Sequence, residues 1–242
     1  MIGARTRHPI RLLALRHGGH WLSLVLVSAV LILTSAPFAS AAPVAEVGDA
    51  GDLPATAQDV TGTGPLDSIS GTIEPASDKD VYRICLTGGQ TFSATTVGGA
   101  TIDTQLFLFD SAGLGVYAND DTQDGVLQST LPSGGLSPSE PGVYYLAIST
   151  WNYDPVSSEG LIFPDEPITA VVGPTGPGGG VPISGWQGDP GDPGPYTITL
   201  TGATFCPAPT TTTQAQCRPG WGKGDKNHCH SGPPGQTGDR PR

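Results

Sequence analysis

The chain has 242 residues, and its 35 Gly and 24 Pro make about a quarter of it residues that interrupt regular structure, so long helices are not expected. With 37% hydrophobic and 14% charged residues it can build one modest core, which predicts a single domain. The net charge is −11, and residues 42–216 hold only Lys79 and Arg83 against twenty acids, which excludes a basic groove for nucleic acid. That stretch contains no His, so a Ser-His-Asp triad, a Cys-His pair or a His-rich zinc site cannot be assembled within it.

Residues 1–41 have the pattern of an export signal. A basic start is followed by the apolar run Trp21–Leu33 and by the small residues Ala39-Ser40-Ala41-Ala42. The thirteen-residue run is shorter than the roughly 20 residues that span a bilayer, which favours a cleaved signal over a permanent anchor. We therefore expect cleavage between Ala41 and Ala42, no membrane attachment afterwards, and a secreted or cell-wall-associated protein.

The remaining chain is predicted to fold mainly as β-structure after a small, acidic lead-in at residues 42–59, which cannot fold by itself. From residue 60 to residue 206, short apolar stretches alternate with turn signals, which is typical of an antiparallel β-sandwich. The expected strands are Ile69–Ile73, Val81–Leu86, Thr91–Val97, Gln105–Asp110, Gly115–Ala118, Val126–Leu131, Val143–Thr150, Ile168–Val172 and Tyr196–Thr204.

In two of these stretches the pattern of apolar residues predicts which faces of the strand are buried. Apolar Tyr196, Ile198 and Leu200 alternate with Thr, which indicates a half-buried strand. In 106–109 (Leu-Phe-Leu-Phe) both faces are apolar, which predicts a strand covered on both sides.

Residues 173–195 form a Gly/Pro-rich insertion with glycine at every third position from Gly185 to Gly194. Only four triplets are in phase, so a long surface loop is favoured over a collagen-like assembly. Trp186 is expected to pin this loop to the sandwich, the alternative being an exposed aromatic that stacks on a ligand.

A Pro/Thr linker at 207–216 leads to a short, irregular basic tail at 217–242. The four cysteines are Cys85, Cys206, Cys217 and Cys229, and an even number in an exported chain indicates disulfides, with three pairings open. The tail also holds His228, His230 and Asp225, so a metal site there is the alternative to a loop closed by a disulfide.

Seven segments occur in an informative order. They are Asp49-Ala50-Gly51-Asp52 with Ala57-Gln58, Ser77-Asp78-Lys79-Asp80-Val81-Tyr82, Gly88-Gly89-Gln90, Asp103-Thr104-Gln105-Leu106-Phe107-Leu108-Phe109-Asp110, Asn119-Asp120-Asp121, Pro141-Gly142-Val143-Tyr144-Tyr145-Leu146-Ala147-Ile148-Ser149 and Tyr196-Thr197-Ile198-Thr199-Leu200. In this order they resemble the bacterial pre-peptidase C-terminal domain family over roughly residues 46–206. The resemblance implies a jelly-roll-like β-sandwich of secreted proteins. Such modules accompany proteases or other exported enzymes, sometimes bind matrix or polysaccharide, and bind calcium in collagenase-associated members.

The jelly roll implied by the resemblance makes the first and last strands neighbours, so we expect Cys85 to pair with Cys206 and, within the tail, Cys217 with Cys229. One difficulty is that strict alternation puts the first two cysteines on different faces of their strands. A bulge at Gly202 would restore the match.

Calcium is the expected cofactor. Asp49 and Asp52 stand where the family has its acidic lead-in, and Asp78 and Asp80 precede the first core strand, so the resemblance implies a site between lead-in and sandwich. Calcium takes six to eight oxygens, which Asp and Asn in turns supply. Asn119, Asp120 and Asp121 form a second candidate cluster, and the alternative for both clusters is that the acids cap turns.

An enzymatic role is not expected. Asp120 with Asp124, or Asp103 with Asp110, could be proposed as paired acids of a glycosidase, but they fall in turns. No Gly-x-Ser-x-Gly, phosphate loop or dinucleotide fingerprint is present.

The sequence therefore predicts an exported, non-catalytic module that binds an extracellular partner such as a matrix protein, polysaccharide or cell wall. The alternatives are a carboxylate-dependent polysaccharide hydrolase and a metal-binding tail on a structural stalk.

Overall fold

The computed structural model describes residues 41–132 and 137–207, and these residues form strands, turns and irregular structure. The predicted all-β class is confirmed. In this part of the chain no helix is long and apolar enough to cross a membrane. The export signal, most of the Pro/Thr linker and the Cys/His tail lie outside the described residues.

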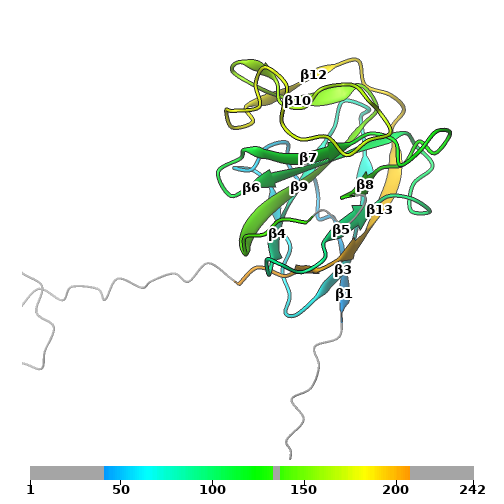
Figure 1. Ribbon diagram of the computed structural model, residues 1–242. Helices are drawn as coiled ribbons and strands as arrows, with labels where there is room; N and C mark the ends of the chain where they lie inside the picture. Colours follow the sequence, from blue (N-terminus) through cyan, green and yellow to red (C-terminus); the bar gives the residue numbers. More distant parts are fainter. Residues whose placement is uncertain (1–40, 133–136, 208–242) are drawn as a thin grey trace, which may run out of the picture. The chain divides into compact units, whose positions relative to one another are not determined.

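Two mainly antiparallel sheets form the β-sandwich, and Figure 1 shows them as two layers. The five-stranded sheet has the order β1 (Ala42–Ala45), β3 (Leu66–Ile73), β13 (Gly194–Thr201), β5 (Ser93–Thr95) and β8 (Thr130–Leu131). The six-stranded sheet has the order β14 (Ala203–Thr204), β4 (Asp80–Leu86), β9 (Gly142–Thr150), β6 (Thr104–Asp110) and β7 (Gly115–Asn119), with β2 (Gln58–Asp59) paired to β4. Among the described strands, β1–β3 and β2–β4 are the pairs that run in parallel.

The core lies between the two sheets and follows the period of two along each strand. Ile84 of β4 and Ile198 of β13 are fully buried in it, one from each sheet. Strand β6 is buried on both faces, as predicted. Leu106 and Leu108 point into this core, whereas Phe107 and Phe109 belong to a second apolar cluster on the outer face of the six-stranded sheet.

The outer face is covered by residues 151–192, which we call the insertion. It contains a small sheet of order β11 (Gly160–Leu161), β10 (Tyr153–Ser157) and β12 (Gly185–Gly188), seen beyond β6 and β7 in Figure 1. The expectation of a plain surface loop at 173–195 is therefore wrong, because β12 pairs with β10 along four residues. Trp186 pins the insertion as predicted: its Nε1 donates to the Asp52 carbonyl at 2.7 Å and its ring packs edge-on against Phe107.

Three sequence expectations differ from the structure. Residues 168–172 form a turn with a single bridge, Ala118 to Val172, because Pro167 has no donor and its carbonyl accepts from the Ala170 amide. Of 126–131 only β8 is strand, since residues 123–126 close a tight turn. The lead-in is part of the sandwich: β1 extends the five-stranded sheet, and Ala50 is fully buried in the core.

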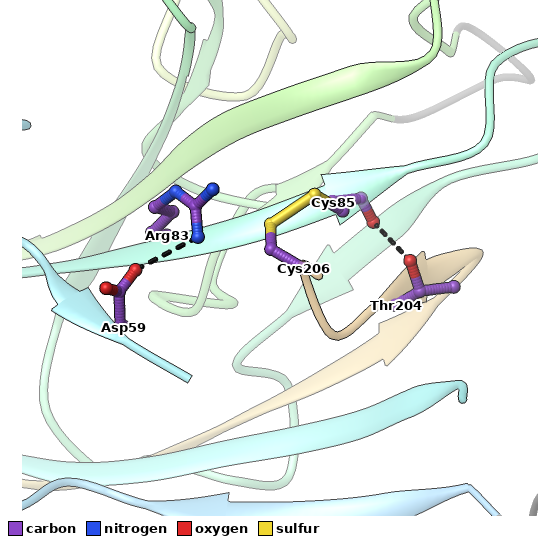
Figure 2. Close-up of a disulfide and its surroundings, with 5 residues drawn as sticks. All are labelled: Asp59, Arg83, Cys85, Thr204 and Cys206. Carbon is purple, nitrogen blue, oxygen red and sulfur yellow. Dashed lines mark hydrogen bonds and ion pairs between the residues drawn. A yellow bond between two sulfur atoms is a disulfide. The ribbon is translucent and has the colours of Figure 1, made fainter. Parts of the chain in front are cut away.

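The predicted Cys85–Cys206 disulfide is present and joins residues 121 positions apart (Figure 2). Gly202, with a φ of +74°, is where the chain leaves β13 in one sheet and enters β14 in the other. The expected bulge is thus a crossover between sheets, and it brings Cys206 beside β4. The Cys217–Cys229 pair lies outside the described residues.

Candidate functional site

Five acids gather where the lead-in meets the start of β4, and we call them the lead-in cluster. Its members are Glu46, Asp49, Asp52, Asp78 and Asp80. Carboxylate oxygens of Glu46, Asp49 and Asp80 lie within 4.8 Å of one another, and so do those of Asp49, Asp52 and Asp78. The four acids singled out in the sequence therefore meet in space.

Backbone bonds and a turn hold the lead-in in place. The Val81 amide donates to the Gly51 carbonyl at 3.1 Å, and the Gly51 amide donates to Asp49 Oδ1 at 3.0 Å. Gly51 has a φ of +69° and a methyl group there would overlap Thr56, so this tight turn requires glycine. The turn places Asp49 and Asp52 against the sandwich.

Glu46 is a member that the sequence reasoning missed. Its Oε1 accepts from the Ala50 amide at 3.2 Å and its Oε2 from the Thr72 amide at 3.0 Å, so it links the lead-in to β3. The available signal was its place in the same acidic segment as Asp49, directly after a short apolar stretch.

Asp80 is the most enclosed acid of the cluster, with no solvent exposure. Its Oδ2 accepts a hydrogen bond of 2.6 Å from the Tyr196 hydroxyl, whereas its Oδ1 has no partner. Burial raises the pKa of the Asp80 carboxyl, the Tyr196 hydrogen bond lowers it, and the charges of Glu46 and Asp78 raise it. Burial likewise raises the pKa of Asp78.

Lys79 is the one basic residue at this cluster. Its ammonium group forms an ion pair with Asp52, donates to the Ser77 carbonyl at 3.2 Å and lies over the Tyr153 ring. The other basic residue of the described chain, Arg83, pairs with Asp59 at 3.1 Å (Figure 2). Four of the five carboxyl groups in the lead-in cluster therefore have no basic partner within 41–132 and 137–207.

A second group, Asp103, Asp120 and Asp121, lies at one end of the β6–β7 hairpin, and we call it the hairpin cluster. Asp103 precedes β6 and the other two follow β7, so antiparallel pairing brings their carboxylate oxygens within 4.8 Å. Asp103 was not predicted here, although its position before an expected strand was the available signal.

Asn119, predicted as a ligand of this second cluster, has a different role. Its Nδ2 donates to the carbonyls of Asp121 and Ala170, and its Oδ1 accepts from the Thr130 amide at 2.7 Å. The buried amide thus fixes the backbone that carries Asp121.

The pKa values of the hairpin cluster are raised. Burial, followed by the charges of Asp103 and Asp121, raises the pKa of Asp120 to about 7. Burial and then the Asp121 charge raise the pKa of Asp103 to about 6. Carboxylates that lie close together without hydrogen-bond donors favour the binding of protons or of a cation.

The pair Asp103 and Asp110, considered for glycoside hydrolysis, finds no support in this geometry. Asp103 precedes the seven-residue strand β6 and Asp110 is its last residue, so the strand separates them by about 20 Å, twice the reach needed across a sugar. Asp110 Oδ1 instead accepts from the amides of Ala112 and Leu114 and caps the β6–β7 turn. The recess beside Asp120 has a volume of about 20 Å³, which suits a water molecule or an ion rather than a sugar ring.

Residues 78–150 match the family model of the bacterial pre-peptidase C-terminal domain. This match confirms the resemblance to the family over that region. The matched region contains Asp78, Asp80 and the whole hairpin cluster, whereas the acids of the lead-in precede it. Pre-peptidase C-terminal domains are in general non-catalytic β modules. No curated protein matches the chain.

Proposed function

We propose that this protein is an exported, non-catalytic binding module in which calcium fastens the acidic lead-in to the sandwich. The observation that carries the calcium part is the unpartnered, fully buried Oδ1 of Asp80, which belongs to a carboxylate grouped with those of Glu46 and Asp49. A buried carboxylate oxygen without a donor is costly, and a hard cation is the partner that several carboxylates can share.

Glu46, Asp49, Asp52 and Asp78 complete a set of oxygen donors that suits calcium. The first three come from the lead-in and Asp78 from the turn before β4, so a bound ion would join two segments about thirty residues apart in the chain. Because the ion binds the folded state, it would stabilise the protein by about 2.7 kcal/mol at a hundredfold excess over its Kd.

Export is supported by the apolar run Trp21–Leu33 and by the Cys85–Cys206 disulfide, since disulfides persist in oxidising compartments. Extracellular modules work with calcium sites of about 10⁻⁴–10⁻³ M. A site of moderate affinity would therefore be sufficient there.

Thermal unfolding of the chain from Ala42 onward, in calcium and in chelator, tests the calcium part. We expect calcium to raise the midpoint by about 5–10 °C at a hundredfold excess. Asp49→Asn/Asp78→Asn should reduce this response, whereas Asp67→Asn, an exposed acid on β3, should keep it in full. Equal unfolding midpoints in calcium and in chelator for the parent protein would refute calcium binding at the lead-in cluster.

Co-sedimentation with insoluble collagen, peptidoglycan and polysaccharides tests the binding part. Retention by one of these materials, with no release of reducing sugar, is expected for a non-catalytic module. Release of reducing sugar would instead support the polysaccharide hydrolase. Retention by none would contradict a role in binding these extracellular materials.

A further inference from the structure

We propose that Asp103, Asp120 and Asp121 bind a second hard divalent cation, which fastens the insertion to the end of the β6–β7 hairpin. This site is separate from the lead-in cluster and uses none of its residues.

The insertion and the hairpin cluster meet through the backbone. The Asp121 amide donates to the Ile168 carbonyl at 3.0 Å, and the Trp151 amide donates to the Asp103 carbonyl at 3.2 Å. Asn119 adds a bond to the Ala170 carbonyl at 3.2 Å. An ion held by the three carboxylates would therefore sit where the first residue and the middle of the insertion contact the hairpin cluster.

The carboxylates themselves have no donors, which is the observation that distinguishes this cluster from acids that cap turns. Asp121 is 6% exposed, and no hydrogen bond or ion pair reaches its carboxylate from the described residues. Oδ1 of Asp103 and Oδ1 of Asp120 are shut off from solvent and also have no partner. By contrast, the carboxylate of Asp110 accepts two backbone bonds.

Among the described residues, no basic side chain pairs with the hairpin cluster. The two basic residues of the described chain, Lys79 and Arg83, are paired with Asp52 and Asp59. Further negative charge comes from Asp154 and Glu166, which add to the field at Asp120. Three convergent carboxylates without a basic partner are the donor set of a hard cation such as calcium.

Calcium titration of the chain from Ala42 onward, by calorimetry at pH 7.5, tests the site. We expect two ions per chain. Asp103→Asn/Asp121→Asn should weaken one of them by about tenfold or more and leave the other. Asp49→Asn/Asp78→Asn should do the reverse, and Asp192→Asn, an exposed acid at the end of the insertion, should leave both.

Hydrogen exchange gives a local readout that does not depend on counting ions. Calcium should slow exchange of amides in 168–172 in the parent protein and in Asp49→Asn/Asp78→Asn, but not in Asp103→Asn/Asp121→Asn. The Asn side chains keep the volume of Asp, and intact near-UV circular dichroism in chelator would verify folding.

The two proposals fail separately. The second site is refuted if Asp103→Asn/Asp121→Asn binds calcium and protects 168–172 as the parent does. It is also refuted if this variant fails to fold and the parent binds a single ion that Asp49→Asn/Asp78→Asn abolishes. In both cases the calcium site at the lead-in cluster stands. If the parent binds a single ion and only Asp103→Asn/Asp121→Asn abolishes its binding, the calcium site at the lead-in cluster is refuted.

Discussion

Tyr82 and Tyr196 join the two sheets through a hydrogen bond of 2.6 Å between their hydroxyl groups. Tyr82 belongs to β4 and Tyr196 to β13, and both side chains are buried. Because the Tyr196 hydroxyl donates its proton to Asp80 Oδ2, Tyr82 must be the donor to Tyr196. A chain of polar groups therefore crosses the core and ends on the acid that belongs to the lead-in cluster.

This order predicts unequal losses of stability. Tyr196→Phe removes both hydrogen bonds and leaves Asp80 Oδ2 and the Tyr82 hydroxyl unpaired in the core, which should cost about 2–4 kcal/mol. Tyr82→Phe removes only one bond and leaves the Tyr196–Asp80 bond intact, so about 1 kcal/mol is expected. Urea unfolding of both variants checks the order, and equal losses would contradict this network.

The crossover between sheets predicts that Gly202 cannot be replaced. A Cβ there would overlap the Thr91 carbonyl, and the φ of +74° is strained for other residues, so Gly202→Ala should cost more than the roughly 1–3 kcal/mol of backbone strain alone. Gly98 is a matched control, since it has the same φ but no atom within 4 Å of an added Cβ. Denaturant unfolding should show a clearly smaller loss for Gly98→Ala; similar losses would show that the close approach to Thr91 has no effect.

The Cys85–Cys206 disulfide should make a large contribution to stability. It closes a loop of 121 residues, for which the chain-entropy model gives about 5 kcal/mol. Cys85→Ser/Cys206→Ser should therefore unfold at a markedly lower urea concentration than the parent. Non-reducing peptide mapping checks the pairing, and a peptide that links Cys206 to Cys217 would disprove it.

Without calcium, stability should fall as pH rises from about 5 to 8. Asp103 and Asp120 have folded-state pKa values of about 6 and about 7, above the ordinary value of 3.8. Their contribution is therefore complete below the unfolded pKa and is lost as pH rises through the folded values.

With calcium the trend should be opposite, because the ion needs the ionised carboxylates. Thermal midpoints at pH 5 and pH 8, each in calcium and in chelator, check both signs. Asp120→Asn should flatten the profile measured in chelator, while Asp67→Asn should leave it unchanged. A flat profile for the parent protein in chelator would contradict the raised pKa values.

The sequence by itself determined the features that depend on local pattern. Alternation in 196–201 and the doubly apolar run 106–109 predicted two core strands and their burial, because side-chain direction in a strand has a period of two. The order of short segments identified the domain family that the comparison confirmed. Four acids of the lead-in cluster were also recognisable, since Asp49 with Asp52 and Asp78 with Asp80 are close neighbours in the sequence.

Only the tertiary structure decided which of these residues meet. Glu46 reaches Asp80 because β1 pairs with β3 and a glycine turn folds the lead-in back, and Asp103 reaches Asp120 because β6 and β7 pair antiparallel. The additional layer formed by the insertion could not be predicted for the same reason, because β10 and β12 are about thirty residues apart and neither has a strong pattern. Periodicity fixes the face on which a side chain lies, whereas contacts between distant segments depend on strand pairing and on burial summed over the whole core.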